Sequence, residues 1–468
     1  MTVAILHRGG VLKWPFHEWL SDATGELHLF AAVPRPDQPR ARMEEAFGRY
    51  ASVHLYELMD RNVRPELDIL ELAERTPLSG LVCLVEWDLE RAGALRSRLG
   101  LPGQDHASAL AYRDKALMKD ILRAKGVPVT PHRRVTSILD VVDHVREHGY
   151  PIVVKPLACG GAMDVHVIRD DAELAALADG GLSPRVEIAP HYVVESFVPG
   201  TEYIVDGLVA DGRMAYCWPS SYLGSTTSFT GTARQLGAAL LDIDHPLRAR
   251  LREIAVRTVE ALPSPGCFPF HAEVFHTPDD RLVVGEIGAR AGGGRIDAMC
   301  ERLFGVNPNR AMARAQAGLD PEVPHGDEVE LVRRLGIHGW IMYWAQPGRA
   351  LRLPPDPAEP WVTDWRLDAE VGQVLRPPSF SGEFFGSAVV AGRSLADVET
   401  RIGALSDWFW SHTEIAPEPA EPGDSTAAGS GGPPVGQQDG AQNGDGGASG
   451  QDAVPELQPV VQRQLTRG

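Results

Sequence analysis

Strand-like and helical runs alternate along the first hundred residues, and no other feature of this chain restricts its fold as strongly. Short apolar runs, partly β-branched, occur at 3–7, 27–33, 52–58 and 80–87. Segments with helical spacing of apolar residues lie at 64–76 and 88–99. Strands that alternate with helices form a parallel sheet with helices on its faces. The N-terminal region is therefore predicted to be an α/β domain.

A second strand–helix pattern follows a long helix that is predicted over 107–125. Strands are predicted at 150–156, 165–170 and 191–198, and two more flank a turn at Asp211-Gly212. Helices are predicted at 135–149, 171–179 and 245–262. The segment 335–412 has the pattern of a small α+β unit whose last helix is at 394–410. The chain is thus expected to contain several α/β and α+β units in series.

Composition and charge limit the partners of the chain. The net charge of -18 argues against sequence-independent binding to nucleic acid or to anionic membranes. No apolar run approaches the ~20 residues of a membrane-spanning helix, and no signal peptide is evident. Five scattered cysteines show no CxxC spacing, so we expect a cytoplasmic protein. Residues 413–468 are rich in Gly, Pro, Ser, Gln and Ala, and we predict that they form a disordered acidic tail.

Two glutamates are predicted to face each other within the segment 270–290. Strand-like runs flank Pro278-Asp279-Asp280, which is typical turn chemistry. A hairpin centred on Asp279 and Asp280 places Glu273 directly opposite Glu286. Like charges in directly opposed positions are destabilising, whereas a divalent cation binds one or two carboxylates together with phosphate oxygens. The alternatives are that one side chain turns into solvent or that the register differs.

Lysines and glycines elsewhere have the pattern of a phosphate site. Lys155 ends the predicted strand at 150–156, and Gly160 and Gly161 follow it, while Lys115 lies forty residues earlier. Glycine lets backbone N–H groups approach a phosphate, and lysine supplies a point charge. A single lysine at a strand end is usually only a solvated charge, so these residues are informative as a set.

In this order and spacing, the lysines, the glycine segment and the E…E-x-x-x-R unit of Glu273, Glu286 and Arg290 resemble the ATP-grasp superfamily of carboxylate–amine ligases. The resemblance covers roughly residues 108–330. It implies an α/β fold, α+β in parts, whose small C-terminal subdomain resembles the biotin-carboxylase and L-amino-acid ligase branches. The expected units are a Rossmann-like domain (1–107), a linker helix and lid (108–200), a C-terminal lobe with the metal site (201–334), the subdomain (335–412) and the tail (413–468).

The resemblance also implies roles for single residues. Lys115 and Lys155 would hold the ATP phosphates, and Gly160 and Gly161 would belong to the loop that closes over them. The adenine and ribose would be held by Glu195, Phe197, Val198 and Glu202. Glu273 and Glu286 would bind Mg²⁺, or Mn²⁺ in its place, and Arg290 would steady a phosphorylated intermediate. One departure from the family pattern is Gly288, where many members have a metal-binding asparagine.

The substrate side of the site is less constrained. His271 lies on the strand face of Glu273 and is expected either to contact the acceptor, to act as a base or simply to pack. Arg234, in the hydroxyl-rich segment 220–237, is a candidate carboxylate clamp, with a solvated loop as the alternative. Small residues at 291–294, including Gly293 and Gly294, are expected to leave room for a bulky acyl group.

The implied reaction is ATP-dependent and ADP-forming, and it joins a carboxylate to an amine through an acyl phosphate. The closest resemblance is to ligases that join amino acids into dipeptides, often for secondary metabolites. The alternatives are a biotin-carboxylase-like enzyme, an enzyme that acylates a carrier-protein thiol, and a non-catalytic nucleotide-binding module. We expect small-molecule substrates and no nucleic-acid or membrane partner. Dimers are common in this superfamily, although no apolar stripe in the sequence identifies an interface.

Overall fold

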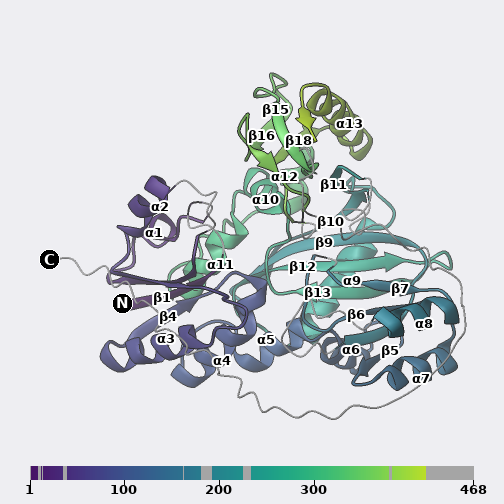
Figure 1. Cartoon of the computed structure of the whole chain (residues 1–468), viewed down its shortest axis with the longest axis horizontal. Coiled ribbons are helices and arrows are strands. Elements are labelled where there is room, and N and C mark those ends of the chain that lie inside the picture. Colours follow the sequence, from purple (N-terminus) through teal and green to yellow (C-terminus); the bar gives the residue numbers. More distant parts are fainter. Residues whose placement is uncertain are drawn as a thin grey trace, which may run out of the picture.

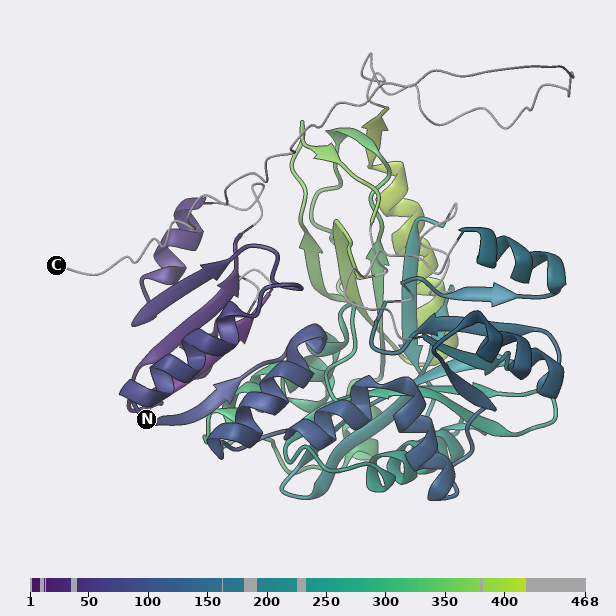
Figure 2. The same cartoon turned by 60° about the horizontal axis from the view of Figure 1, so that its bottom comes forward.

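The computed structural model describes residues 2–8, 12, 14–34, 40–161, 163–180, 192–224, 233–378 and 382–417. In both views, the N-terminal sheet and the lid lie on opposite sides of one large sheet, and the C-terminal strands rise above it (Figures 1 and 2). Within the described ranges, no helix has the length and apolar character needed to cross a membrane.

The N-terminal domain has the predicted parallel sheet. Its strand order is β3 (Ser52–Tyr56), β2 (Leu27–Ala32), β1 (Thr2–His7) and β4 (Leu78–Val82), and every pairing is parallel. Its helices are α1 (Phe16–Trp19), α2 (Arg40–Phe47), α3 (Arg64–Arg75) and α4 (Leu89–Leu99). The prediction that the fourth strand reaches residue 87 is wrong, because β4 ends at Val82 and a 3-10 turn, η1, occupies Glu86–Asp88.

The long helix predicted over 107–125 is broken into two helices. They are α5 (His106–Arg113) and α6 (Lys115–Ala124), and Asp114 separates them in an extended conformation. The Asp114 carboxylate accepts hydrogen bonds from the backbone N–H groups of Ala116 and Leu117, so it caps the start of α6. The apolar periodicity runs on across Asp114, so periodicity alone predicts a single helix here.

A small antiparallel sheet with two helices forms the lid. Its strand order is β5 (His132–Val135), β8 (Tyr192–Ser196), β6 (Ile152–Pro156) and β7 (His166–Ile168). The helices α7 (Ile138–His148) and α8 (Asp171–Gly180) accompany it (Figure 1). Strand β5 was not predicted, whereas the other strands and both helices lie within two or three residues of their predicted bounds.

The large sheet has eight strands and extends into the C-terminal region. Its order is β13 (Leu282–Gly288), β12 (Phe268–His276), β9 (Thr201–Ala210), β10 (Arg213–Leu223), β11 (Gln235–Leu240), β14 (Ile337–Tyr343), β18 (Gly386–Gly392) and β16 (Val362–Leu367). Asp211 and Gly212 both have positive φ and form the predicted turn between β9 and β10. Because β14 pairs with β11, strands from both sides of the predicted boundary near residue 334 belong to one continuous sheet.

Helices and small strands complete the structure around this sheet. The predicted helix α9 (Arg248–Ala261) packs against β10 and β13. Helices α10 (Ile296–Phe304), α11 (Pro308–Gln316) and α12 (Glu328–Leu335) were not predicted, and α11 packs against β4 and α1 of the N-terminal domain. The C-terminal region adds β15 (Gly348–Arg352), β17 (Val374–Leu375), α13 (Leu395–Ser411) and β19 (Glu414–Ala416).

The predicted start of the acidic tail at residue 413 is wrong, because β19 pairs with β15. The rest of that prediction, from residue 418 onward, lies outside the described residues.

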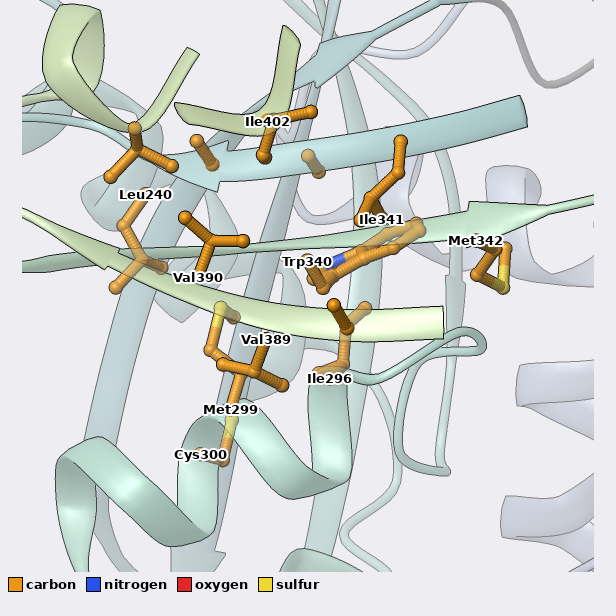
Figure 3. Packing of buried hydrophobic residues seen from close by; sticks show 14 of the residues in the cluster. Leu240, Ile296, Met299, Cys300, Trp340, Ile341, Met342, Val389, Val390 and Ile402 are labelled. Atoms are coloured by element: carbon orange, nitrogen blue, oxygen red, sulfur yellow. The ribbon is translucent and has the colours of Figure 1, made fainter. Parts of the chain in front are cut away.

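The largest core joins the large sheet to α10 and α13. Figure 3 shows Trp340 of β14 and Val389 of β18 above Ile296 and Met299 of α10. All four side chains are at most 2% exposed. This packing fixes the segment that connects β13 to α10, which carries Arg290 and the glycine run.

Candidate active site

The hairpin β12–β13 brings Glu273 and Glu286 into directly opposed positions, as predicted. The predicted turn centre is wrong by half a residue, because Thr277 N–H donates to Arg281 O and the turn is centred on Asp279. The next pair toward the turn is Val274 with Val284, so Gly285 has no partner of its own and is the extra residue of a β-bulge. This bulge restores the predicted register at the two glutamates.

The carboxylates on this face have unusual electrostatics. Burial, followed by repulsion from Glu286 and Glu202, raises the pKa of Glu273 to about 8. Burial and repulsion from Glu286 raise the pKa of Glu202 to about 7. Burial alone would also raise the pKa of Glu286, but Lys115 and Lys155 outweigh it and lower that pKa. Lys155 and His271 also act to lower the pKa of Glu273, but burial and the two glutamates outweigh them.

These two glutamates fit a divalent cation that also binds nucleotide. Within the described part of the chain, Glu273 forms no ion pair and no cluster of three or more Asp, Glu, His and Cys side chains has metal-binding geometry. Mg²⁺ typically binds through one or two carboxylates and completes its shell with phosphate oxygens and water. The donor set of the hairpin matches this type of site and does not match an all-protein cage.

The two predicted phosphate lysines meet at Glu286. Lys115 Nζ lies 3.3 Å from Glu286 Oε2, and Lys155 Nζ lies 3.8 Å from the same oxygen. Lys155 Nζ also lies 3.1 Å from Glu195 Oε1. The structure therefore brings together residues from α6, β6, β8 and β13 that are up to 171 positions apart in the sequence.

A third lysine, which was not singled out from the sequence, belongs to the same cluster. Lys119 is fully buried, and its Nζ donates to Gly285 O at 2.5 Å and lies 3.4 Å from Glu195 Oε2. Burial alone would raise the pKa of Glu195, but Lys119 and Lys155 lower it to about 2. The Glu195 side chain thus points into the lysine cluster, while its backbone lies in β8.

The glycine segment lies against these cations. Lys115 Nζ donates to Cys159 O at 2.7 Å, and Arg113 donates to Ala158 O. Gly161 has a φ of 68°, which glycine adopts without strain. Burial raises the pKa of the Cys159 thiol, as expected for a packing residue and not for a nucleophile.

The residues expected at the adenine follow strand β8. Phe197 is 42% exposed, and its N–H donates to Pro151 O at 3.0 Å. Val198 comes next in the chain, and Glu202 lies in β9 opposite Phe275 of β12. Glu202 therefore shares a sheet face with Glu273 and is within electrostatic reach of Glu286.

Arg290 lies directly after β13 and bonds to a residue of the N-terminal domain. Its Nε donates to Glu86 Oε2 at 2.7 Å, and its Nη1 donates to Ala291 O at 3.0 Å. Arg113 Nη1 lies 2.6 Å from the other oxygen of Glu86. The carboxylate of Glu86 is thus shared by two arginines.

His271 is held by an aspartate of the neighbouring strand. His271 Nδ1 and Asp206 Oδ1 are 2.8 Å apart, and both side chains are buried. Burial alone would lower the pKa of His271, but Asp206 outweighs it and raises that pKa. A Cβ at Gly292 would lie 2.7 Å from His271 Nδ1, so glycine there allows the backbone to pack against this pair.

The other substrate-side predictions have mixed outcomes. A Cβ at Gly293 would meet no described atom within 4 Å, but a Cβ at Gly294 would lie 3.0 Å from Trp340. The space at Gly294 is therefore filled by the indole, and the expected room for a bulky acyl group is not found there. The guanidinium of Arg234 lies over the Trp410 ring, 5.4 Å from its centroid, and not in the lysine and glutamate cluster.

Comparison with known proteins agrees with this geometry. Residues 114–213 match the family model described as the carbamoyl-phosphate synthase L chain, ATP binding domain. An L-arginine-specific L-amino acid ligase of Bacillus subtilis is 29% identical over 304 residues, which are 63% of this chain and 70% of that protein. A D-alanine–D-alanine ligase of Bifidobacterium animalis is 29% identical over 231 residues, which are 42% of this chain and 58% of that protein.

The chain is an ATP-grasp ligase. Its fold is similar to that of the L-amino acid ligase from Bacillus licheniformis, with a TM-score of 0.66, 19% identity, and coverage of 89% of this chain and 99% of that one. The biotin carboxylase from Campylobacter jejuni is also similar, with a TM-score of 0.63 and 14% identity, over 88% of this chain and 92% of that one. The reaction class of this ATP-grasp ligase is the ATP-dependent, ADP-forming joining of a carboxylate to an amine.

Four residues of the site were missed at the sequence level. Lys119 had a local signal, because it lies one helical turn after Lys115 on the same face. Glu86 and Arg113 had none, since Glu86 is 204 positions from Arg290 and 27 positions from Arg113 in the sequence. Asp206 had only its place in a strand, and its role depends on the register between β9 and β12.

Proposed function

We propose that this ATP-grasp ligase joins two amino acids, or an amino acid and a similar carboxylic acid, through an acyl phosphate. The observation that carries the proposal is the convergence of the Glu273–Glu286 pair with Lys115, Lys155 and Arg290 on one side of the large sheet. The nature of the substrates is supported by the similarity to the L-arginine-specific L-amino acid ligase.

In this proposal, the lysines and the glycine segment bind the nucleotide phosphates. Lys115 and Lys155 supply the positive charge, and Gly160 and Gly161 allow the backbone to approach the phosphate oxygens. Glu195, Phe197 and Val198 of the β8 region bind the adenine, and Glu202 binds the ribose hydroxyls. Lys115 Nζ has three N–H donors and contacts Cys159 O and Glu286, so one donor is left for a phosphate oxygen.

Glu273 and Glu286 are the residues that would hold Mg²⁺, or Mn²⁺ in its place. When bound, the cation neutralises charge on the phosphate oxygens. The raised pKa of Glu273 and the absence of an ion pair at its carboxylate among the described residues both fit this assignment. Gly288 supplies no third side-chain ligand, so the two glutamates and the nucleotide oxygens have to suffice.

The reaction has two steps. A substrate carboxylate attacks the γ-phosphate of ATP, and the products are an acyl phosphate and ADP. The amine then attacks the acyl carbon, the carbon–oxygen bond to phosphate breaks, and the amide, inorganic phosphate and a proton are released. Arg290 stabilises negative charge on the phosphoryl group, where one such donor commonly contributes roughly 3–4 kcal/mol.

The acceptor amine is proposed to lie near His271, Gly293 and Gly294. His271 is fixed by Asp206 and lies on the same strand face as Glu273, close to the proposed phosphoryl group. Arg234 would bind a substrate carboxylate only if its guanidinium moved away from the Trp410 ring.

ADP and phosphate release in the presence of amino-acid pools tests the proposal directly. We expect release that depends on Mg²⁺ and on one amino acid as donor and one as acceptor, together with a dipeptide that mass spectrometry detects. Release with bicarbonate alone would instead support a biotin-carboxylase-like reaction. Release only with a carrier protein would support thiol acylation, and nucleotide binding without any release would support a non-catalytic module.

A further inference from the structure

Glu86 connects the N-terminal domain to the catalytic half of the molecule. It begins the 3-10 turn η1, shortly after the carboxyl end of β4 in the parallel sheet. Its Oε2 accepts a hydrogen bond from Arg290 Nε at 2.7 Å, and its Oε1 lies 2.6 Å from Arg113 Nη1. One carboxylate therefore bridges the end of α5 and the segment that follows β13.

Arg290 is fixed at two of its three nitrogens. Glu86 binds Nε, and Ala291 O accepts a hydrogen bond from Nη1 at 3.0 Å. Among the described residues, Nη2 has no hydrogen-bond partner of its own. A guanidinium is planar and rigid, so fixing two nitrogens also sets the direction of the third. Glu86 and the backbone thus determine the direction of Nη2, the nitrogen that is left for a phosphoryl oxygen.

Two glycines of the site pack against the same carboxylate. A Cβ at Gly160 would lie 2.8 Å from Glu86 Oε2, and a Cβ at Gly288 would lie 3.6 Å from Oε1. The glycine segment that is expected to cover the phosphates therefore lies directly on Glu86. Arg113, the second partner of Glu86, also donates to Ala158 O in this segment.

The Glu86 carboxylate stays ionised in this buried position. Burial alone would raise the pKa of Glu86, but the coulombic attraction of Arg290 and Arg113 lowers it to about 2. Its side chain is 15% exposed, and those of Arg290 and Arg113 are 21% and 6% exposed. Charge-assisted hydrogen bonds of this kind are shorter and stronger than neutral ones.

We propose that Glu86 is a positioning residue of the ligase reaction, which holds Arg290 with Nη2 directed at the phosphoryl group and keeps Arg113 against the glycine segment. The proposal rests on the proposed function, in which Arg290 stabilises phosphoryl charge. It predicts that the N-terminal domain contributes to the phosphoryl-transfer step and not only to the shape of the substrate site. A purely structural ion pair would instead stabilise the domain interface without an effect on that step.

The test compares Glu86→Gln and Glu86→Asp with the control Glu66→Gln. Glu66 is also paired with an arginine of the N-terminal domain, Arg91 at 2.8 Å, but it touches no residue of the proposed site. The readouts are kcat for amino-acid-dependent ADP release, KM for MgATP, and the melting temperature. We expect Glu86→Gln to lower kcat roughly 100-fold with KM for MgATP within about threefold, Glu86→Asp to recover part of the loss, and Glu66→Gln to stay within about twofold of wild type.

Two results would overturn the proposal. One is a kcat of Glu86→Gln within about threefold of wild type, and the other is a rise in KM for MgATP that parallels the fall in kcat. If Glu86→Gln lowers the melting temperature so far that it cannot be assayed, Glu86→Asp decides, since it keeps the charge but shortens the reach to Arg290. No amino-acid-dependent ADP release by the wild-type enzyme would contradict the proposed function, and this outcome is separate from any effect of Glu86.

Discussion

The lysine side and the carboxylate side of this site are prepared very differently. The lysine side consists of Lys115, Lys119 and Lys155, and each of them lies within 3.4 Å of a glutamate oxygen. The carboxylate side consists of Glu202 and Glu273, whose pKa values are raised to about 7 and 8. The protein alone thus balances the charges of the lysine side, but it does not balance those of the carboxylate side.

Glu286 lies between the two sides and shows what the difference means. It is opposite Glu273 in the hairpin, and it also contacts Lys115 and Lys155. An unpaired buried charge is costly, whereas a paired one costs much less. The protein therefore tolerates the carboxylate side only with protons or with a bound cation, and this requirement links the site to Mg²⁺ and nucleotide.

The replacement Glu286→Gln should have the largest effect, because it disturbs both sides. We expect activity to fall by roughly 10³-fold with the loss of a metal ligand. Lys115 would lose its glutamate partner and Lys155 one of its two, so the free energy of unfolding should fall by about 2–3 kcal/mol. ADP release and urea unfolding measure the two effects. Unchanged stability would show that the lysines do not depend on Glu286.

The replacement Glu273→Gln should separate activity from stability. We expect a similar loss of activity, by roughly 10²–10³-fold, but no loss of stability in the absence of metal, because the change removes repulsion with Glu286 and Glu202. The same unfolding experiment, without Mg²⁺, provides the measurement. A destabilisation equal to that of Glu286→Gln would mean that the two sides do not differ as described.

The lysine side itself contains a structural and a functional member. The Lys119 side chain is fully buried and bonds to Gly285 O and Glu195, whereas that of Lys155 is 15% exposed. Lys119→Met should therefore reduce the free energy of unfolding by about 2 kcal/mol and raise KM for ATP only a fewfold. Lys155→Met should raise KM for ATP by about tenfold or more, which corresponds to about 1.4 kcal/mol. Equal effects of both variants on KM would place Lys119 at the phosphates as well.

Local sequence patterns predicted much of the fold and one contact of the site. Alternating strands and helices predicted the α/β fold and the parallel N-terminal sheet, since these patterns are local. The hairpin pattern predicted that Glu273 faces Glu286, although the bulge at Gly285 was not foreseen. Family resemblance supplied Lys115, Lys155 and Arg290.

Long-range partners could not be predicted in this way. Glu86 meets Arg290 only because the N-terminal domain packs against the later part of the chain, and no periodicity encodes that packing. Asp206 meets His271 only through strand register. Helices α10 to α12 were missed because each has only eight or nine residues, too few for a long periodic pattern. The room expected at Gly294 is taken up by Trp340 from a strand 46 residues later.

The smallest expected effect is a pH dependence of stability that comes from the carboxylate side. Because the pKa of Glu273 is about 8 in the folded protein and about 4.3 in an unfolded chain, the folded state binds more protons between these values. The stability of the metal-free protein should therefore fall as pH rises, by about 2 kcal/mol from pH 6.5 to 8.5. The charged groups that face Glu273 are Glu286, Glu202, His271 and Lys155.

Melting temperatures at pH 6.5 and 8.5, with and without MgATP, measure this effect. The range starts at pH 6.5 because of His144, whose pKa is lowered to about 4 by burial. Below pH 6.5 this histidine makes stability rise with pH, which would oppose the effect of Glu273. MgATP should remove most of the fall by supplying positive charge at the glutamates, and Glu273→Gln should show a smaller fall without any ligand. A fall of the same size in Glu273→Gln would assign the pH dependence to other groups and leave the carboxylate side without its expected repulsion.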